Sequence, residues 1–325
     1  MKNILVLGGA GYIGSHTVKN VIKNGYRAIV ADNLVYGHKE AVLAHDFYIA
    51  DIGNKAELNK IFAENKIDAV IHFAGYAYVG ESVFAPQKYY KNNVVNTINV
   101  LECMLENNVK NIVFSSSCTT YGNQTVDLID ENCTQLPINP YGWSKYIIER
   151  VLDDYDRAYG VKSICLRYFN AAGADKDGEL MEKHIPEPHL IPVLLETAMG
   201  KRDFVKIFGT DYDTPDGTCV RDYTHVEDLA KAHVLALEKL FEEQKSYKVN
   251  LGTGVGTSIK ELISAVERVT GNKIPVVYAQ RREGDPAKLV SSNKFAYELL
   301  GWKPEYTDID DIVESAYKVM LNPPF

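Results

Sequence analysis

The chain opens with Ile4-Leu5-Val6-Leu7 and continues directly into Gly8-Gly9-Ala10-Gly11-Tyr12-Ile13-Gly14. The apolar run is typical of a parallel strand that is covered on both faces. Residues 15–24 then predict a helix that ends at Gly25. This order can bind a pyrophosphate, because backbone N–H groups approach the phosphates and the helix N-terminus adds partial positive charge. We interpret the stretch as a dinucleotide-binding fingerprint; the alternative is a tight turn without a ligand.

The end of the next strand indicates which dinucleotide binds. Residues 27–31 predict a strand, and Asp32 stands at its end. A carboxylate about twenty positions after the fingerprint accepts hydrogen bonds from a ribose 2′-hydroxyl and repels a 2′-phosphate. Asn33 follows instead of an arginine, so NAD is favoured over NADP. The alternative is that Asp32 is only a solvated turn residue.

The composition excludes several classes of protein. The 325 residues carry a formal net charge of −8, so no surplus of basic side chains is available to neutralise nucleic acid. No apolar stretch approaches the length needed to cross a membrane. The five cysteines are scattered without a C-x-x-C pair, as is typical of a reduced compartment. We therefore expect a cytoplasmic protein that binds neither nucleic acid nor membranes.

Strands and helices alternate up to about residue 170. Further strands are predicted at 47–50, 69–73, 111–114 and 163–167, and the longest helices at 82–107 and 141–159. This alternation predicts an α/β fold with a doubly wound, parallel, Rossmann-like sheet. Ligands of such sheets bind beyond the carboxyl ends of the strands, where this sequence places polar clusters.

The pattern changes after residue 170. Residues 174–190 combine charges with prolines and predict a loop. Beyond it, strands are predicted at 204–208, 247–251 and 275–278 and helices near 225–242, 258–270, 293–300 and 308–321. We expect residues 1–170 to form an NAD-binding domain and residues 171–325 a smaller α/β substrate-binding cap, with the chain crossing back to the sheet.

Two further patterns are weaker. Residues 252–256, Gly-Thr-Gly-Val-Gly, also lie between a strand and a helix, but no acidic strand end follows them. A structural turn with a capped helix is therefore favoured over a second nucleotide loop. His184 and His189 suggest a metal pair. Pro186 and Pro188 lie between them and exclude a helical i, i+4 arrangement, so we predict no metal.

The strongest chemical signal is Tyr141 with Lys145. Pro140 favours a helix start, so the two side chains lie one turn apart on one face. Ionising a tyrosine near neutral pH requires roughly 4 kcal/mol. An ammonium about 6 Å away supplies roughly 2.8 kcal/mol, and the positive nicotinamide ring of NAD can supply the remainder. Tyr141 is therefore the candidate base, and Ser117, at the end of the preceding strand, can relay a substrate proton.

Together these residues resemble the extended short-chain dehydrogenase/reductases, and within them the UDP-glucose 4-epimerases. The resemblance covers essentially the whole chain. Besides the glycine loop and residues 139–145, matching motifs lie at 32–34, 51–52, 72–75, 79–82, 92–94, 115–122, 167–170, 190–192, 220–223 and 281–285.

The resemblance implies an enzyme that keeps NAD bound and inverts C4 of a UDP-hexose. Tyr141 would take the proton of the 4-hydroxyl while C4 gives hydride to NAD. The transient 4-keto sugar would turn over before hydride returns to its other face. UDP-glucose and UDP-galactose are the expected pair, with UDP-GlcNAc and UDP-GalNAc as further candidates. A homodimer formed by helices 82–107 and 141–159 is also implied.

The same resemblance assigns site residues by motif. The catalytic residues are Tyr141, Lys145 and Ser117. The cofactor-binding residues are Gly8, Gly11, Tyr12, Ile13, Gly14, Asp32, Asn33, Asp51, Ile52, Phe73, Ala74, Gly75, Asn92, Ser115, Tyr141, Lys145 and Tyr168. The substrate-binding residues are Ser117, Tyr141, Phe169, Asn170, Leu190, Lys206, Phe208, Arg221, Arg282, Asp285 and Leu289. Leu289 is intermediate between the tyrosine and the smaller residues of other members, which implies room for an N-acetyl group.

Some positions depart from the family pattern, and two other functions compete. Ala77 stands where some members carry a lysine near the cofactor, Tyr36-Gly37 replaces an Asn-Ser pair, and His189 stands in place of an asparagine. A sugar-nucleotide 4,6-dehydratase would need an Asp-Glu pair where this chain has Cys118 and Thr119. A non-catalytic NAD-sensing protein would not need the three catalytic residues together.

Overall fold

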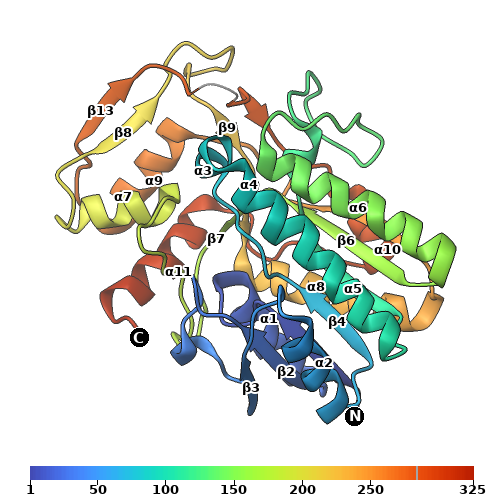
Figure 1. Ribbon diagram of the computed structural model, residues 1–325. Helices are drawn as coiled ribbons and strands as arrows, with labels where there is room; N and C mark the ends of the chain where they lie inside the picture. Colours follow the sequence, from blue (N-terminus) through green and yellow to red (C-terminus); the bar gives the residue numbers. More distant parts are fainter. Residues whose placement is uncertain (283–284) are drawn as a thin grey trace.

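The glycine-loop unit begins a parallel sheet of seven strands in the order β3-β2-β1-β4-β5-β6-β11 (Figure 1). The computed structural model describes residues 1–282 and 285–325. The strands are β1 (Asn3–Leu7), β2 (Arg27–Asp32), β3 (Asp46–Ile49), β4 (Ala69–His72), β5 (Asn111–Ser117), β6 (Lys162–Tyr168) and β11 (Tyr247–Leu251). Every neighbouring pair is parallel, which confirms the predicted doubly wound sheet.

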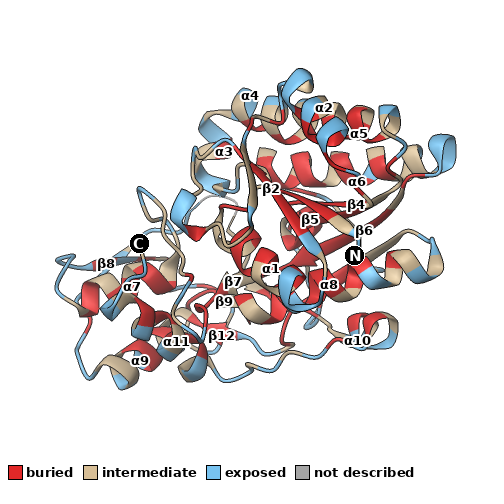
Figure 2. Ribbon diagram, turned by 90° about the horizontal axis from the view of Figure 1, so that it is seen from below, coloured by how far each residue is buried: buried red, intermediate tan, exposed pale blue. Residues whose placement is uncertain are grey.

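Helices cover both faces of this sheet (Figure 2). One face carries α1 (Tyr12–Lys23), α8 (Val226–Glu243) and α10 (Lys294–Leu300), and the other carries α2 (Lys55–Glu64), α5 (Asn96–Glu106) and α6 (Pro140–Tyr159). Ile4 and Val6 belong to the first core, whereas Leu5 and Leu7 belong to the second. Successive side chains of a strand point to opposite faces, so burial on both sides explains the apolar run.

The strand order reverses beside β1. The chain proceeds from β1 to β2 and β3 on one side, then returns to build β4, β5 and β6 on the other. The segments that follow β1 and β4 therefore leave the sheet in opposite directions. This opens a crevice at the carboxyl ends of these strands, the position where ligands of doubly wound sheets bind.

The prediction of one helix over 82–107 is wrong. α3 (Val79–Phe84) ends at Ala85, whose φ of −131° and ψ of 53° are not helical, before α4 (Pro86–Tyr89) begins. A residue before proline is disfavoured in the helical region, which explains the break. A π-helical turn, η2 (Tyr90–Val95), then joins α4 to α5.

α6 confirms the helix predicted at 141–159. The Asn139 side chain accepts a backbone N–H of the first turn at 2.9 Å, and Pro140 occupies the first helical position. Gly160 ends the helix with a φ of 70°. The first two turns of α6 therefore start beside the end of β5, where Tyr141 and Lys145 are buried.

The chain after β6 builds a smaller unit around a third core. Its helices are α7 (Leu190–Ala198), which was not predicted, α9 (Ile259–Thr270) and α11 (Ile309–Leu321). Its strands are β7 (Asn170–Ala172), β8 (Val205–Phe208), β9 (Val220–Arg221), β10 (Tyr223–His225), β12 (Thr257–Ser258), β13 (Val276–Ala279) and β14 (Lys288–Leu289). Short 3₁₀ turns are η1 (Lys39–Ala41) and η3 (Cys118–Tyr121).

Three elements from the smaller unit's half of the chain, β11, α8 and α10, join the large sheet or cover it. β11 pairs with β6 at its edge, and α8 packs on α1. The chain thus crosses back from the smaller unit. Within the described residues, none of the helices combines the length and the apolar character that a membrane span requires.

Candidate active site

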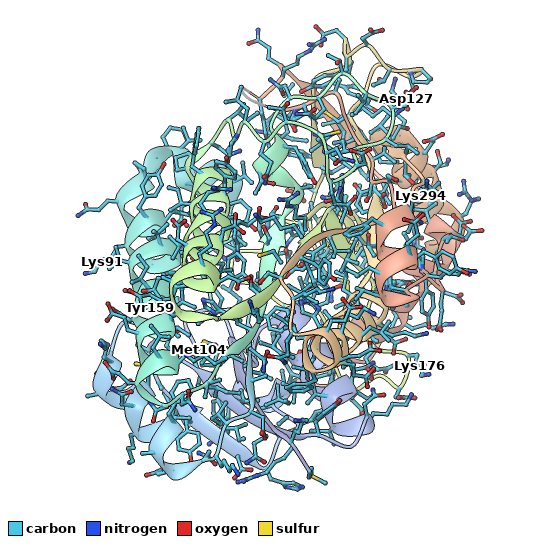
Figure 3. All side chains as sticks on the ribbon, turned by 90° about the vertical axis from the view of Figure 1, so that its right-hand side faces the viewer. Lys91, Met104, Asp127, Tyr159, Lys176 and Lys294 are labelled. Carbon is cyan, nitrogen blue, oxygen red and sulfur yellow. The ribbon has the colours of Figure 1, made fainter. Side chains whose placement is uncertain are left out.

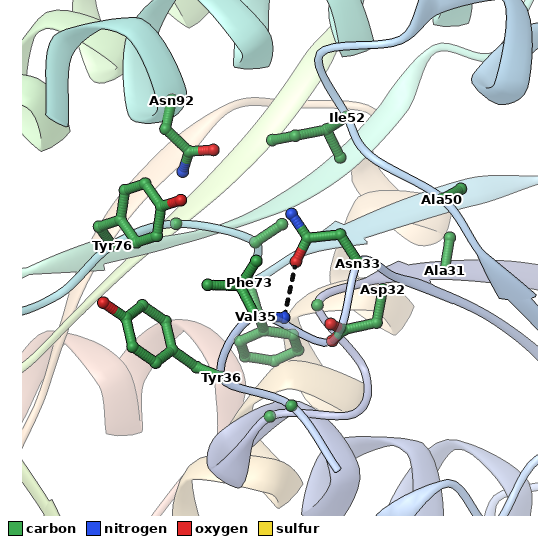
Figure 4. Close-up of a pocket in the computed structure, with 15 residues that line it drawn as sticks. Ala31, Asp32, Asn33, Val35, Tyr36, Ala50, Ile52, Phe73, Tyr76 and Asn92 are labelled. Atoms are coloured by element: carbon green, nitrogen blue, oxygen red, sulfur yellow. Dashed lines mark hydrogen bonds between the residues drawn. The ribbon is translucent and has the colours of Figure 1, made fainter. Parts of the chain in front are cut away.

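A cleft lies at the crevice between β1 and β4 (Figure 4). The predicted cofactor residues in its lining are Gly8, Gly11, Asp32, Asn33, Ile52, Phe73, Ala74, Gly75 and Asn92. The lining also includes Ala31, Val35, Tyr36, Gly37, Ala50 and Tyr76, which were not predicted. In Figure 4 the rings of Tyr36 and Tyr76 stand on the opposite side from Asp32 and Asn33. Both tyrosines follow strand ends closely in the chain, and this was the available sequence signal.

The glycines of the first loop meet two different needs. Gly8 has a φ of +80°, and a Cβ at Gly8 would lie 2.6 Å from the nitrogen of Ala74. A Cβ at Gly14 would lie 2.1 Å from the oxygen of Gly8. Both positions therefore require glycine for packing. A Cβ at Gly11 would meet only the oxygen of Gly8, at 3.4 Å, so a bare backbone at Gly11 mainly keeps the cleft open.

The start of α1 is free to bind an anion. Gly11 offers no side-chain cap, and the first turn carries no acidic residue. Over residues 1–282 and 285–325, no acceptor is found for the N–H groups of Tyr12 and Ile13. Unpaired N–H groups at a helix N-terminus are suited to a phosphate. The Tyr12 hydroxyl instead turns toward the smaller unit, where it donates to the carbonyl of Gly173 at 2.6 Å.

The Asp32 carboxylate is held in place at the end of β2. It accepts the N–H of Ala10 at 3.0 Å and that of Leu34 at 2.8 Å, and burial raises its pKa. Its oxygens retain lone pairs for ribose hydroxyls. Asn33 donates to Asp51 at 2.9 Å, which joins the segments after β2 and β3. Free amides, an open approach at Gly11 and an oriented carboxylate together fit NAD.

Tyr141, Lys145 and Ser117 come together at the carboxyl end of β5. The ammonium nitrogen of Lys145 lies 5.9 Å from the centre of the Tyr141 ring, close to the expected separation. Lys145 also donates to the carbonyl of Ser115 at 2.6 Å. The hydroxyls of Ser115 and Tyr168 share a hydrogen bond. Ser117 lies close enough to Tyr141 to lower the pKa of its phenol, and all five predicted residues are buried.

This buried group borders the cleft at Gly75. A Cβ at Gly75 would lie 3.6 Å from the ammonium nitrogen of Lys145 and 3.4 Å from the amide oxygen of Asn93. Because Gly75 also lines the cleft, a ligand there reaches Lys145 past a residue without a side chain. The remaining predicted cofactor residues outside the lining are Tyr12, Ile13 and Gly14 in the first turn of α1, and Asp51 after β3.

Burial favours the neutral form of both Tyr141 and Lys145. It raises the pKa of Tyr141 to about 12, although the hydrogen bond from Ser117 acts in the opposite direction. It lowers the pKa of Lys145 to about 8, against the attraction of Cys165 and Glu149. We expected the lysine to make the phenol more acidic, but burial has the larger effect in the protein alone. Ionisation of Tyr141 therefore needs further positive charge, which oxidised NAD carries.

Sequence reasoning missed an ion pair next to this group. Arg167 donates to both oxygens of Glu149, at 2.9 and 2.6 Å, and to the Tyr121 hydroxyl at 2.7 Å. Ser116 and Gln135 donate to the same carboxylate. The available signal was a glutamate on the apolar face of a predicted helix, because such a residue is rarely buried without a partner.

The predicted substrate residues gather between η3 and the smaller unit. Phe169 and Leu289 pack against Cys118 in one buried cluster. β9 and β14 pair Leu289 with Arg221, which forms an ion pair with Asp285. This arrangement places a cation directly beside a buried apolar cluster.

Five further predicted substrate residues lie in the smaller unit. The guanidinium carbon of Arg282 lies 3.9 Å from the centre of the Phe208 ring. Lys206 is exposed on β8, on the same face as Phe208. Leu190 begins α7, and Asn170 begins β7. The 281–285 motif is described except for Glu283 and Gly284, which lie outside the described residues.

The second glycine loop is filled by a carboxylate of the protein itself. Asp222 accepts the N–H groups of Thr253 at 2.8 Å, Gly254 at 3.0 Å and Ser291 at 3.1 Å. Ser258 caps α9 in a reciprocal capping box. This confirms the prediction of a structural turn.

The loop predicted at 174–190 brings its two histidines together without a helix. Nδ1 of His184 and Nδ1 of His189 each lie within 3.5 Å of oxygens of both Glu182 and Glu187. The prolines do exclude a helical pair, but the loop still brings the two side chains together, so the absence of a metal stays a prediction.

Comparison with known proteins places the chain in a family. Residues 4–252 match the NAD dependent epimerase/dehydratase family. The UDP-glucose 4-epimerase of Halalkalibacterium halodurans is 50% identical over 314 residues, which cover 97% of this chain and 94% of the relative. The crystal structure of UDP-glucose 4-epimerase from Brucella ovis in complex with NAD superposes with a TM-score of 0.95, at 50% identity and 98% coverage of each chain. That from Bifidobacterium longum in complex with NAD⁺ and UDP gives a TM-score of 0.93, at 40% identity and 99% coverage of each.

These matches span nearly the whole length of the chain and of its relatives. They agree with the resemblance drawn from the glycine loop and the Tyr141–Lys145 helix. This protein belongs to the NAD dependent epimerase/dehydratase family.

Proposed function

We propose that this chain interconverts UDP-glucose and UDP-galactose by inverting C4 of the hexose, with NAD in the cleft between β1 and β4. The observation that carries the proposal is the buried group of Tyr141, Lys145 and Ser117 bordering a cleft that fits NAD. The relatives described above, at about half identity, are UDP-glucose 4-epimerases. The larger unit would hold the cofactor and the smaller unit the UDP-sugar.

In the proposed mechanism, Tyr141 accepts the proton of the sugar 4-hydroxyl and later returns one. Bound NAD supplies a hydride acceptor and donor for C4 and a positive charge beside the phenol. Ser117 holds the reacting sugar oxygen, and its own hydroxyl oxygen is fixed by the hydroxyl of Thr119 at 3.0 Å. Lys145, fixed by the carbonyl of Ser115, stabilises the phenolate. General acid–base catalysis of this kind contributes about 10²–10⁴-fold.

The nucleotide would be held at the smaller unit. Arg221 and Arg282 suit pyrophosphate and ribose oxygens because a guanidinium is a fixed, permanently charged fork. Pairing with Asp285 orients Arg221 and still leaves it further N–H donors. Binding the UDP part firmly and the hexose weakly allows either face of C4 to approach the same hydride position. The wall at Leu289 would admit an N-acetyl group.

Dehydration is disfavoured by the residues beside Ser117. Cys118 is buried and burial raises its pKa to about 12, so it stays a neutral thiol. Thr119 uses its hydroxyl to bind Ser117. Neither side chain can act as the carboxylate pair that removal of water would need.

We further propose a homodimer in the cytoplasm. Figure 3 shows α6 beside the segment from α4 to α5, with Lys91 pointing away from the molecule. Phe84, at the end of α3 just before this segment, is 90% exposed, and Val95 within it is 53% exposed, so apolar surface is available for a second copy. The five cysteines are all free, as suits a reduced compartment.

A direct assay separates the candidate functions. Protein incubated with UDP-galactose should form UDP-glucose without loss of water, and denaturation should release NAD. A product that has lost water would identify a dehydratase. Binding of NAD without turnover would identify a sensor.

The glycine loop offers a matched test of NAD binding. Gly11→Ala should fold but lose bound NAD, because Gly11 lines the cleft and its Cβ would meet only the oxygen of Gly8, at 3.4 Å. Gly14→Ala should instead fail to fold, because its Cβ would collide with the backbone. Full NAD content in folded Gly11→Ala would contradict the proposed cofactor position.

A further inference from the structure

Outside the proposed active site, Glu182, His184, Glu187 and His189 converge on one point. Each offers one ligand atom, and these four atoms lie within 4.8 Å of one another. We propose that the four side chains bind one divalent cation of the zinc class. The site would be structural, because the protein supplies all four ligands.

The distances match a tetrahedral site. Nδ1 of His189 lies 2.8 Å from Glu182 and 3.0 Å from Glu187, and Nδ1 of His184 lies 3.5 Å and 3.2 Å from the same two carboxylates. Zinc bonds to nitrogen and oxygen of about 2.0–2.1 Å place tetrahedral ligand atoms about 3.3 Å apart. The four observed nitrogen–oxygen separations lie on both sides of this value, with the two imidazoles facing different oxygens of Glu187. A cation at their centre therefore requires only small movements.

Hydrogen bonding alone accounts poorly for this convergence. Each Nδ1 carries at most one hydrogen, and that hydrogen can point well at only one oxygen. Yet each Nδ1 faces oxygens of both glutamates. A metal cation can instead bind one atom of each of the four side chains at the same time.

A divalent cation would also balance the charge of the cluster. The side chains of Glu182 and Glu187 are only 8% and 6% exposed, and among the described residues neither forms an ion pair with a lysine or arginine. Two carboxylates with neutral imidazoles carry a charge of −2, which a divalent ion cancels. The other acidic group, Asp175, Asp177 and Glu179, differs because Lys19 binds all three residues.

Neighbouring groups orient the ligands as in protein metal sites. The backbone N–H groups of His184 and His189 donate to Glu187 at 3.2 and 2.9 Å. The Tyr78 ring packs edge-on against both imidazoles, with centroids 6.0 and 6.1 Å away. His38 donates to the carbonyl of Lys183 at 2.9 Å and so fixes the loop between the ligands. Imidazole with carboxylate favours zinc over magnesium or calcium.

The test measures metal binding without using catalysis. Full-length protein is loaded with zinc chloride, freed of excess by gel filtration and analysed for metal per chain. Cobalt(II) in a parallel sample reports tetrahedral geometry through its intense visible absorption. The variants are His184→Gln and Glu182→Gln, and the matched control is His45→Gln, because His45 is exposed and outside the cluster.

We expect about one zinc per chain in the wild type and in His45→Gln, and a Tm that rises by several degrees with zinc. Both cluster variants should lose the zinc and the cobalt spectrum while remaining folded by circular dichroism. Should one variant not fold, the other still decides. Equal zinc in wild type and in the cluster variants, or no zinc retained by the wild type, would overturn the proposal.

Discussion

Two buried basic residues beside α6, Arg167 and Lys145, differ in how fully their charges are paired. Arg167 binds both oxygens of Glu149 and the hydroxyl of Tyr121, and this network holds the pKa of Glu149 below its usual value. Lys145 lies one helical turn before Glu149, and its one hydrogen-bond partner in the described part of the chain is the carbonyl of Ser115. Burial therefore lowers the pKa of Lys145 to about 8.

The contrast separates a structural group from a functional one. A buried ion pair with every donor and acceptor used can stabilise one packing arrangement and has nothing left to offer a ligand. A buried ammonium with one neutral partner destabilises the folded protein. We therefore expect such a group mainly at a site where a ligand interacts with its charge. We therefore expect substitutions in the Arg167 network to change the stability of the fold. Substitutions in the Lys145 group should instead change the turnover rate.

The largest expected effect is on turnover. Tyr141→Phe removes the proposed base and should lower kcat by about 10²–10⁴-fold while leaving stability and bound NAD nearly unchanged. Tyr121→Phe is the matched control: it removes a buried hydroxyl bound to Arg167 and Asn250. It should cost about 1–3 kcal/mol of stability and spare kcat. The contrast between the two regions fails if kcat of Tyr141→Phe stays near that of the wild type.

The next effect concerns stability. Arg167→Met leaves the Glu149 carboxylate buried without its cation and should lower the free energy of unfolding by about 3–5 kcal/mol. The double variant Arg167→Met with Glu149→Leu removes both charges and should regain most of this loss. Urea denaturation at pH 7 measures both. A single variant as stable as the wild type would show that the pair is not a structural anchor.

Lys145 should make stability depend on pH in a defined window. Burial lowers its pKa from the usual value of 10.5 to about 8, so below pH 8 the buried ammonium is charged in both folded and unfolded chains and its full cost is present. Between about pH 8 and 10.5 the unfolded chain binds more protons than the folded one, so stability rises with pH. Relative to Lys145→Met, the wild type should gain on the order of 3 kcal/mol across this window. A difference that stays constant from pH 7.5 to 9.5 would contradict the lowered pKa.

The same variant tests the link to chemistry. Without the ammonium, the pH at which activity sets in should rise by about two units, because a cation about 6 Å away supplies roughly 2.8 kcal/mol of phenolate stabilisation. Lys145→Arg should restore most of the profile if charge is what matters. An unchanged profile in Lys145→Met would assign Lys145 to packing alone.

The contrast also marks what the sequence can reveal. β1, its glycine turn and α1 were predictable because an unbroken apolar run, missing side chains and helix length are local properties. Tyr141 and Lys145 were predictable because a helix fixes their spacing. The pairing of Glu149 with Arg167 and the convergence of His184 with His189 depend on how distant strands and loops meet. No local pattern encodes such contacts, and the prolines near His184 even argued against them.

Leu289 lies where the two regions meet, and it carries the smallest expected effect. It is 7% exposed and packs with Tyr121, which belongs to the Arg167 network. It also packs with Phe169 and with Cys118, the residue after Ser117. If it borders the sugar, the leucine leaves room for an N-acetyl group, and the wild type should turn over UDP-GlcNAc as well as UDP-glucose.

Leu289→Tyr should then lower kcat/KM for the N-acetylated pair selectively, by about 5- to 150-fold, which corresponds to about 1–3 kcal/mol of overpacking. Ile129→Phe is the matched control, because Ile129 belongs to the same buried cluster. It should lower the Tm but leave the ratio of the two kcat/KM values unchanged, since overpacking away from the sugar affects both substrates alike. If Leu289→Tyr also lowers only the Tm, Leu289 belongs with Tyr121 and Arg167 on the structural side, and the boundary of the sugar pocket lies closer to Ser117.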